Sequence, residues 1–340
     1  MHSKIMETKS ISSVLGWPTR KVAGTFKPSH ESVLFVNFRS ALYCLANKLN
    51  SKKVWLPSYM CESVINSIDN PRFYKIGKNF NYTGNELCYC KPNDLIVAVD
   101  FFGFPFDKRI LETAKKRSAL VVEDLSMSCF SKSNNDSDFI LYSLTKSMGI
   151  SDGAVLEQNT KSKISFDLQK PPNDFIETSM IARLLRSQNY NFSPLNWHKW
   201  FVEGKKKNPL GFFSISEESK MAMHTIDKLK ILENFNRYKK SFKHEFTIEK
   251  NIIPSCYPIL VNQRDQVQKE LYKFGIYCSI QWPLLSIAKK YIESHIISKS
   301  ILCLPCGDNC SKDEIDYVSS NLLKLANKMK LKINFHRESW

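Results

Sequence analysis

Two short apolar runs in the middle of the chain end abruptly in polar residues. The first run, residues 119–122, stops at Glu123 and Asp124, and the second, residues 139–144, carries Ser143 near its end and is followed by Lys146. An apolar run that ends in an acid is typical of a buried strand whose carboxyl end faces a site. An acid and an amine at two such ends therefore predict a functional site at one edge of a sheet.

Apolar runs alternate with helical patterns through the first third of the chain. We expect strands at 33–36, 53–56, 72–76, 95–102 and 119–124, and helices at 37–50, around 64–68 and at 108–116. Such alternation predicts right-handed crossovers and a mostly parallel sheet with helices on both faces. Ligands of these sheets bind beyond the carboxyl ends of the strands.

The rest of the chain predicts a second, smaller unit. Residues 158–213 read as mixed helices and loops, and a continuous helical pattern covers 214–246. Strands are expected near 257–261 and 276–280, and helices near 264–273 and 313–327. Because 340 residues are many for one core, we expect an arm at 1–30, a large domain at 31–215 and a small α+β domain at 216–340.

Charge and cysteine content narrow the function classes. The net charge of +16 favours an anionic ligand, a nucleic acid or an acidic surface, but no basic module of the usual nucleic-acid kinds is visible. No apolar run reaches the ~20 residues of a membrane span, and the first residues lack the apolar core of a signal peptide. The ten cysteines are therefore expected as free thiols in the cytoplasm.

Cysteine spacing leaves one alternative open. Cys303, Cys306 and Cys310, with Cys88 and Cys90, could ligate a metal, but their spacing does not match a structural zinc site. Buried thiols are the preferred interpretation, and no metal is expected.

A lysine amine becomes a nucleophile when burial or neighbouring groups lower its pKa, and it can then bind a carbonyl cofactor. Pyridoxal 5'-phosphate (PLP) needs that lysine, a carboxylate on its pyridine nitrogen and a cup for its phosphate. Lys146, Asp124 and Ser143 match these three needs. An Asp that caps a turn and a Lys exposed in a loop are the plain structural readings of each residue alone.

These segments resemble the DegT/StrS-type nucleotide-sugar aminotransferases, which are PLP enzymes of the aspartate-aminotransferase-like fold type I. The similarity is carried by NFRSALYCLANKL (37–49), KVWLPSYMCESVI (53–65), VVEDLSMS (121–128) and LYSLTKSMGISDGAVL (141–156). Weaker similarity continues through 264–283 and 302–306. The resemblance implies a seven-stranded, mostly parallel sheet and a smaller α+β domain at the C-terminus.

The resemblance also implies roles for single residues. Asp124 would bind the pyridine nitrogen, and Lys146 would bind the cofactor covalently and move the proton of the reaction. Ser143 and the backbone amides of Arg39 and Ser40 would hold the phosphate. Because dehydratases of the family have His at the lysine position, Lys146 favours transamination.

Several positions differ from the family pattern. Asn37 and Phe38 replace the small pair at the phosphate turn, and Cys61 stands where an aromatic residue commonly stacks on the ring. Met127 replaces the Gln that contacts the ring hydroxyl, and Cys129 replaces a nearby His.

The resulting hypothesis is a cytoplasmic, homodimeric, PLP-dependent aminotransferase. It would move an amino group from an amino acid, expected to be glutamate, to a nucleotide-linked keto sugar for surface polysaccharide or another glycoconjugate. Two alternatives remain, namely a diverged or inactive member with another ketone or amino-acid substrate, and a basic protein that binds nucleic acid or an acidic surface.

Some residues have two readings. The lysines at 205–207 suit either a solvated loop or a diphosphate. Arg39 suits either the substrate or the turn. Trp197, Trp200, Trp282 and Tyr190 suit either the core or stacking on a base or sugar.

Overall fold

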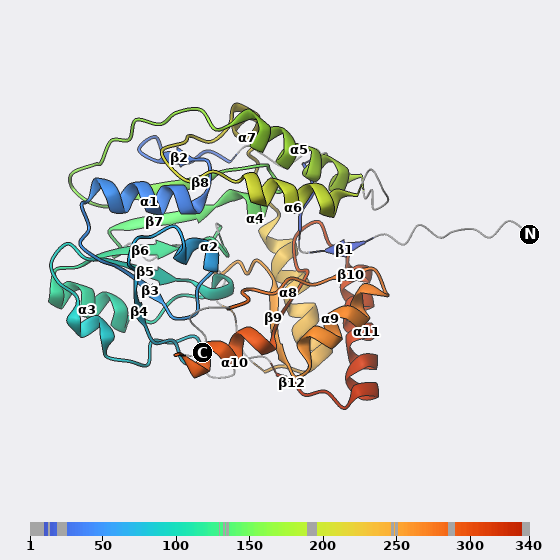
Figure 1. Ribbon diagram of the computed structural model, residues 1–340. Coiled ribbons are helices and arrows are strands. Elements are labelled where there is room, and N and C mark those ends of the chain that lie inside the picture. Colours follow the sequence, from blue (N-terminus) through green and yellow to red (C-terminus); the bar gives the residue numbers. More distant parts are fainter. Residues whose placement is uncertain are drawn as a thin grey trace, which may run out of the picture.

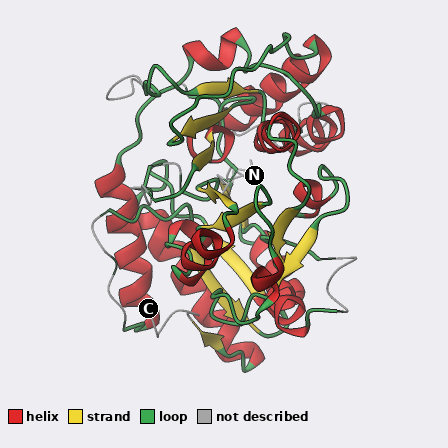
Figure 2. Ribbon diagram, turned by 90° about the vertical axis from the view of Figure 1, so that its left-hand side faces the viewer, coloured by secondary structure: helices red, strands yellow, loops and turns green. Residues whose placement is uncertain are grey.

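The computed structural model describes residues 10–12, 14–18, 26–128, 130–131, 133, 136–188, 196–245, 248, 251–284 and 290–334. Two regions are visible in Figure 1, a large sheet with its helices and, beside it, a second group of elements from the C-terminal part of the chain. In the side view of Figure 2, helices lie around the strands of both regions.

A seven-stranded sheet forms the centre of the first region, and six of its strands are parallel. Only β8 runs antiparallel, between β2 and β7. In their order across the sheet the strands are β2 (Val33–Phe35), β8 (Ala154–Gln158), β7 (Phe139–Ser143), β6 (Leu120–Asp124), β5 (Leu95–Val99), β3 (Val54–Pro57) and β4 (Arg72–Tyr74). The predicted mostly parallel sheet is confirmed, and β8 is a strand that the pattern did not predict.

The central strands are buried throughout because both faces of the sheet are covered. Every residue of β3, β5 and β7 is buried, as the unbroken apolar runs required. Helix α1 packs on β7 and β8, and α3 packs on β6. The helices and 3-10 turns of this region are α1 (Phe38–Lys48), α2 (Glu62–Ile65), η1 (Glu86–Tyr89), η2 (Phe101–Gly103), α3 (Arg109–Arg117), α4 (Leu144–Met148), α5 (Asn173–Ser187) and α6 (Trp197–Lys207).

The second region holds a small antiparallel sheet of order β11-β9-β12 and a parallel pair, β1 with β10. The pair joins the N-terminal segment to the C-terminal part of the chain. Helix α7 (Glu217–Met221) lies with the large sheet, near α5 (Figure 1). The elements of the second region are β1 (Ile11–Ser12), α8 (Lys228–Phe242), β9 (Tyr257–Val261), α9 (Arg264–Tyr272), β10 (Ile276–Tyr277), α10 (Ile292–Ser300), β11 (Ile301–Leu304), α11 (Lys312–Met329) and β12 (Ile333–Asn334). The domain boundaries at 30/31 and 215/216 stay a prediction.

The single helical pattern expected over 214–246 is wrong, because the chain stops α7 at Met221 and starts α8 at Lys228. Asp227 begins the new helix as its N-cap, since its side chain accepts a hydrogen bond from the Lys230 amide at 3.0 Å. The Asp227 amide in turn donates to Asp308 Oδ2 at 3.1 Å. A helical period alone cannot reveal a break that a distant loop stabilises.

Within the described residues, no helix is long and apolar enough to cross a membrane. The same part of the chain contains no group of three or more His, Cys, Asp or Glu residues arranged to hold a metal ion. Its nine cysteines are free thiols. Burial raises the pKa of both Cys303 and Cys306, which keeps these thiols protonated and inert.

Candidate functional site

The ends of β6 and β7 bring an acid and an amine to the same edge of the sheet. These strands are parallel neighbours, with Asp124 paired to Leu141 two residues before Ser143. Asp124 is the last residue of β6 and is buried. Lys146 lies in α4, which starts directly after β7. The strand order therefore places both side chains at one edge, as the sequence pattern predicted.

Ser126 connects these two groups, and the sequence interpretation missed it. The Ser126 amide donates to Asp124 Oδ1 at 2.8 Å, and Lys146 Nζ donates to Ser126 Oγ at 3.4 Å. Burial raises the pKa of the Asp124 carboxyl above its ordinary value, while the Lys146 charge and the Ser126 hydrogen bonds oppose this. A serine two residues after a strand-ending aspartate is the local signal that could have indicated the contact.

An aromatic wall lies beside the amine. Lys146 Nζ lies 5.5 Å from the centre of the Trp282 ring, close enough for a cation–π contact. Trp282 packs on Tyr59 and Phe101, which follow the ends of β3 and β5. Of the aromatics with two readings, Trp282 is therefore placed at the site. Trp197 is buried under Arg186, and Tyr190 lies outside the described residues.

The start of α1, predicted to hold a phosphate, is already hydrogen-bonded within the protein. Asn37 caps the helix, because its Oδ1 accepts from the Ser40 amide at 2.8 Å. Asn37 Nδ2 donates to Asn208 Oδ1 at 2.7 Å, and Arg39 donates to the Asn208 carbonyl at 3.1 Å. A phosphate could use the Ser40 amide only after the Asn37 side chain turns away.

The other predicted site residues occupy three different environments. Ser143 is buried at the end of β7, and its Oγ lies 3.4 Å from Thr145 Oγ1. Cys61 is half-buried, and its thiol contacts Ser63 Oγ at 3.1 Å. Met127 is fully buried in the core. Cys129 lies outside the described residues.

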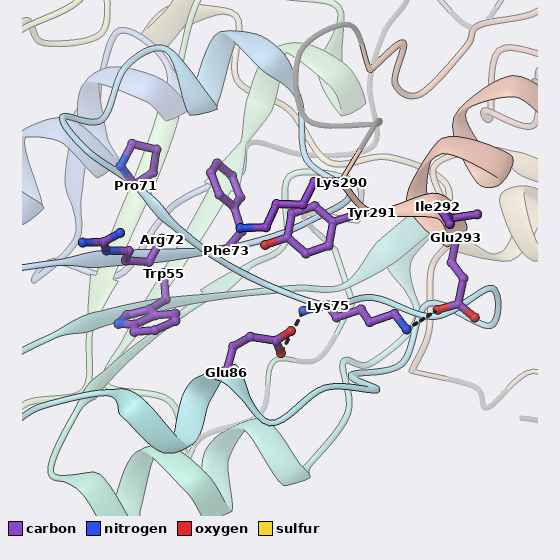
Figure 3. Close-up of a pocket in the computed structure, with 10 residues that line it drawn as sticks. All are labelled: Trp55, Pro71, Arg72, Phe73, Lys75, Glu86, Lys290, Tyr291, Ile292 and Glu293. Carbon is purple, nitrogen blue, oxygen red and sulfur yellow. Dashed lines mark hydrogen bonds and ion pairs between the residues drawn. The ribbon is translucent and has the colours of Figure 1, made fainter.

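Two pockets differ in their relation to this site. A small cavity of about 30 Å³ is lined by Lys146 and by residues of the C-terminal part, among them Cys306 and Asp308. A larger pocket of about 600 Å³ lies between β4 and α10, and none of the predicted site residues lines it. Figure 3 shows two contacts of Lys75 in this pocket: its backbone amide donates to Glu86 Oε2 at 3.3 Å, and its ammonium group pairs with Glu293 at 3.4 Å. The Lys75 ammonium is therefore neutralised within the protein.

Comparison with known proteins yields structural matches alone. No family model matches the sequence, and no curated protein matches it. The sugar aminotransferase CalS13 from Micromonospora echinospora has a TM-score of 0.59 at 15% identity, covering 86% of this chain and 87% of that one. The aminotransferase PseC from Helicobacter pylori, involved in the biosynthesis of pseudoaminic acid, has a TM-score of 0.61 at 15% identity, covering 94% and 100%. The chain has the aminotransferase fold.

A third match is the PMP form of Spr1654 from Streptococcus pneumoniae. Its TM-score is 0.62 at 14% identity, covering 92% of this chain and 93% of that one. At such low identities the agreement concerns the fold, and it confirms the PLP-dependent transferase architecture expected from the sequence.

Proposed function

We propose that the protein is a PLP-dependent aminotransferase. The observation that carries the proposal is the pair of Asp124 and Lys146 at neighbouring strand ends, joined through Ser126. The fold adds support, because Spr1654, which shares it, has a PMP form. PMP is the form of the cofactor in which an aminomethyl group replaces the aldehyde of PLP.

The donor set suits this cofactor. Asp124 would bind the ring nitrogen, Lys146 the carbonyl carbon, and the Ser143 hydroxyl a phosphate oxygen. Arg39 and the Ser40 amide would approach the same phosphate after Asn37 releases that amide. The remaining proposed contacts are Cys61 and Met127. Of these residues only Lys146 lines the small cavity of about 30 Å³, so that cavity is not the space that the cofactor would fill.

Each polar residue has a definable task. Bound here, PLP would supply an electron sink that lets an amino group pass from one substrate to another. Asp124, in its buried setting, would keep a proton on the ring nitrogen. Lys146 Nζ would take a proton from one carbon and return it to another. Ser126 would orient both groups, since it contacts each of them in the protein alone.

The finer proposal concerns the substrates. We infer a keto sugar carried by a nucleoside diphosphate as acceptor and an amino acid, glutamate, as donor. The basic charge of the chain suits an acceptor with two phosphates, and CalS13 is a sugar aminotransferase. A cytoplasmic homodimer that serves polysaccharide or glycoconjugate synthesis completes this proposal.

An absorbance experiment tests the cofactor assignment. After incubation with PLP we expect a visible band that borohydride abolishes, with the cofactor's mass on the peptide that contains Lys146. Lys146→Met should remove the band, whereas Lys199→Met, an exposed lysine of α6, should keep it. A wild-type protein that takes up no PLP would refute the proposal.

A second candidate, a protein of this fold without transaminase activity, draws on one observation. Asn37 already occupies the Ser40 amide. A wild-type protein that binds PLP, yet transfers no amino group from glutamate or other amino acids to any keto-sugar nucleotide in a screen, would favour this candidate.

A further inference from the structure

Two cations lie over one aromatic ring, and one of them contacts the residue directly before the candidate lysine. The Phe201 ring of α6 has Arg183 Cζ 5.4 Å from its centre and Lys205 Nζ 4.5 Å from it. Arg183 also donates to the carbonyl of Thr145 at 3.2 Å, and Thr145 directly precedes Lys146. These contacts link Lys205 to the segment that carries the proposed catalytic amine.

Lys205 differs from the two lysines that follow it. Lys206 pairs with Glu203 at 3.1 Å, and Lys207 pairs with Asp174 at 3.7 Å. Among the described residues no carboxylate pairs with Lys205. Its side chain is exposed to solvent. The three lysines at 205–207 are therefore not equivalent, and only the first is available for a ligand.

The positive charge around Lys205 lacks a counterion within the described residues. Arg183 is buried and donates to two backbone carbonyls, those of Leu15 and Thr145. Solvent reaches the Lys205 side chain, while the protein around its amine desolvates it in part. This partial desolvation lowers the pKa of Lys205, as do the charges of Arg183 and Lys146, against an opposite effect of Cys61. A bound anion would relieve this repulsion.

We propose that Lys205 binds a phosphate group of a ligand held at Lys146. The inference rests on the proposed function for the identity of that ligand, but the excess of cations does not depend on it. The phosphate could belong to a nucleotide-linked substrate or to PLP itself. Both share the chemistry of a phosphate oxyanion, which ammonium groups bind through charge-assisted hydrogen bonds.

Binding titrations with three variants test this role. Lys205→Met removes the charge at similar length, Lys205→Arg keeps it, and Lys206→Met is a matched control one residue away. Inorganic pyrophosphate is titrated into PLP-treated protein, and PLP is titrated into PLP-free protein, both by calorimetry at low ionic strength to limit screening. Melting temperatures show whether each variant is folded.

We expect Lys205→Met to weaken one of the two titrations by about 10-fold or more, the usual effect of losing one charge-assisted hydrogen bond. Lys205→Arg and Lys206→Met should stay within about threefold of wild type. Weakened pyrophosphate binding assigns Lys205 to the substrate phosphate, and weakened PLP binding assigns it to the cofactor. Equal affinities in wild type and Lys205→Met, an equal loss in Lys206→Met, or a wild type that binds neither probe overturns the proposal.

The two proposals can fail separately. A protein that takes up no PLP but binds pyrophosphate through Lys205 refutes the aminotransferase and leaves the phosphate site standing. A protein that takes up PLP on Lys146 but is indifferent to Lys205→Met refutes the phosphate site alone.

Discussion

Replacing Asp124 by Asn should stabilise the PLP-free protein while it damages the proposed reaction. The carboxylate is buried, and burial raises its pKa despite the nearby charge of Lys146. The free-energy cost of desolvating the carboxylate therefore exceeds the stabilisation that it gains from Lys146 and from the Ser126 hydrogen bonds. Asn keeps an oxygen that can accept from the Ser126 amide, which now donates to Oδ1 at 2.8 Å, and it carries no charge.

The expected gain is about 1 kcal/mol in the free energy of unfolding at neutral pH, typical of removing a local functional conflict. It corresponds to a rise of about 1–2 °C in melting temperature for a chain of 340 residues. Transamination should fall by about 10²–10⁴-fold, the range for a group that holds a proton in the transition state. Urea unfolding and a glutamate half-reaction with PLP measure the two effects.

The pH dependence has a definite sign. An acid whose pKa is raised on folding binds its proton more tightly in the folded state, so its contribution to stability falls as pH rises from 3.8, the ordinary value, through the raised value. The advantage of Asp124→Asn should therefore vanish in acid and become complete above the folded-state pKa. Unfolding curves of both proteins across this range test the linkage.

Asp124→Ala provides the control that separates charge from hydrogen bonding. Alanine also removes the charge but leaves the buried Ser126 amide without its acceptor, which costs about 1–3 kcal/mol. We thus expect opposite signs for Asn and Ala in the PLP-free protein. If Asp124→Asn destabilised the protein at neutral pH by as much as Asp124→Ala, the attraction between Asp124 and the Lys146 charge would exceed the desolvation cost of the carboxylate. That result would refute the reasoning.

Three further substitutions test the scaffold around the site. Asp152→Ala leaves three buried donors of two serines without their acceptor, and should cost about 2–4 kcal/mol in urea unfolding; an unchanged midpoint contradicts this. Gly149→Ala forces a side chain into a left-handed backbone (φ +73°) and within 2.1 Å of the Gly16 carbonyl, so we expect about 2 kcal/mol of destabilisation, whereas a neutral effect would mean that the segment yields freely. Arg186→Met removes donors to two carbonyls of the N-terminal segment, and faster amide exchange there is expected, with exchange in β6 as the unaffected reference.

The central strands were predictable because local composition decides them. A run such as 95–99 has no polar residue to present to water, so it can only be a strand or helix buried on all sides, and its length favours a strand. Other elements were less predictable. Strand β8 pairs with β2 and the two-residue β1 pairs with β10, partners far away in sequence, and the break before Lys228 depends on Asp308.

The sequence by itself determined the parallel sheet and the acid and amine at its edge, because strand periodicity and the polar residues that end each strand are local properties. Only the tertiary structure decided which groups surround them. Ser126 contacts both Asp124 and Lys146, and Trp282 from the C-terminal part of the chain lies beside the Lys146 amine. Asn37 accepts the hydrogen bond of the Ser40 amide at the start of α1. Lys206 pairs with Glu203 of its own helix, which is a local contact, whereas the pairing of Lys207 with Asp174 of α5 appears only in the tertiary structure. Apart from that helix pair, these contacts depend on distances between remote segments, which no local pattern encodes.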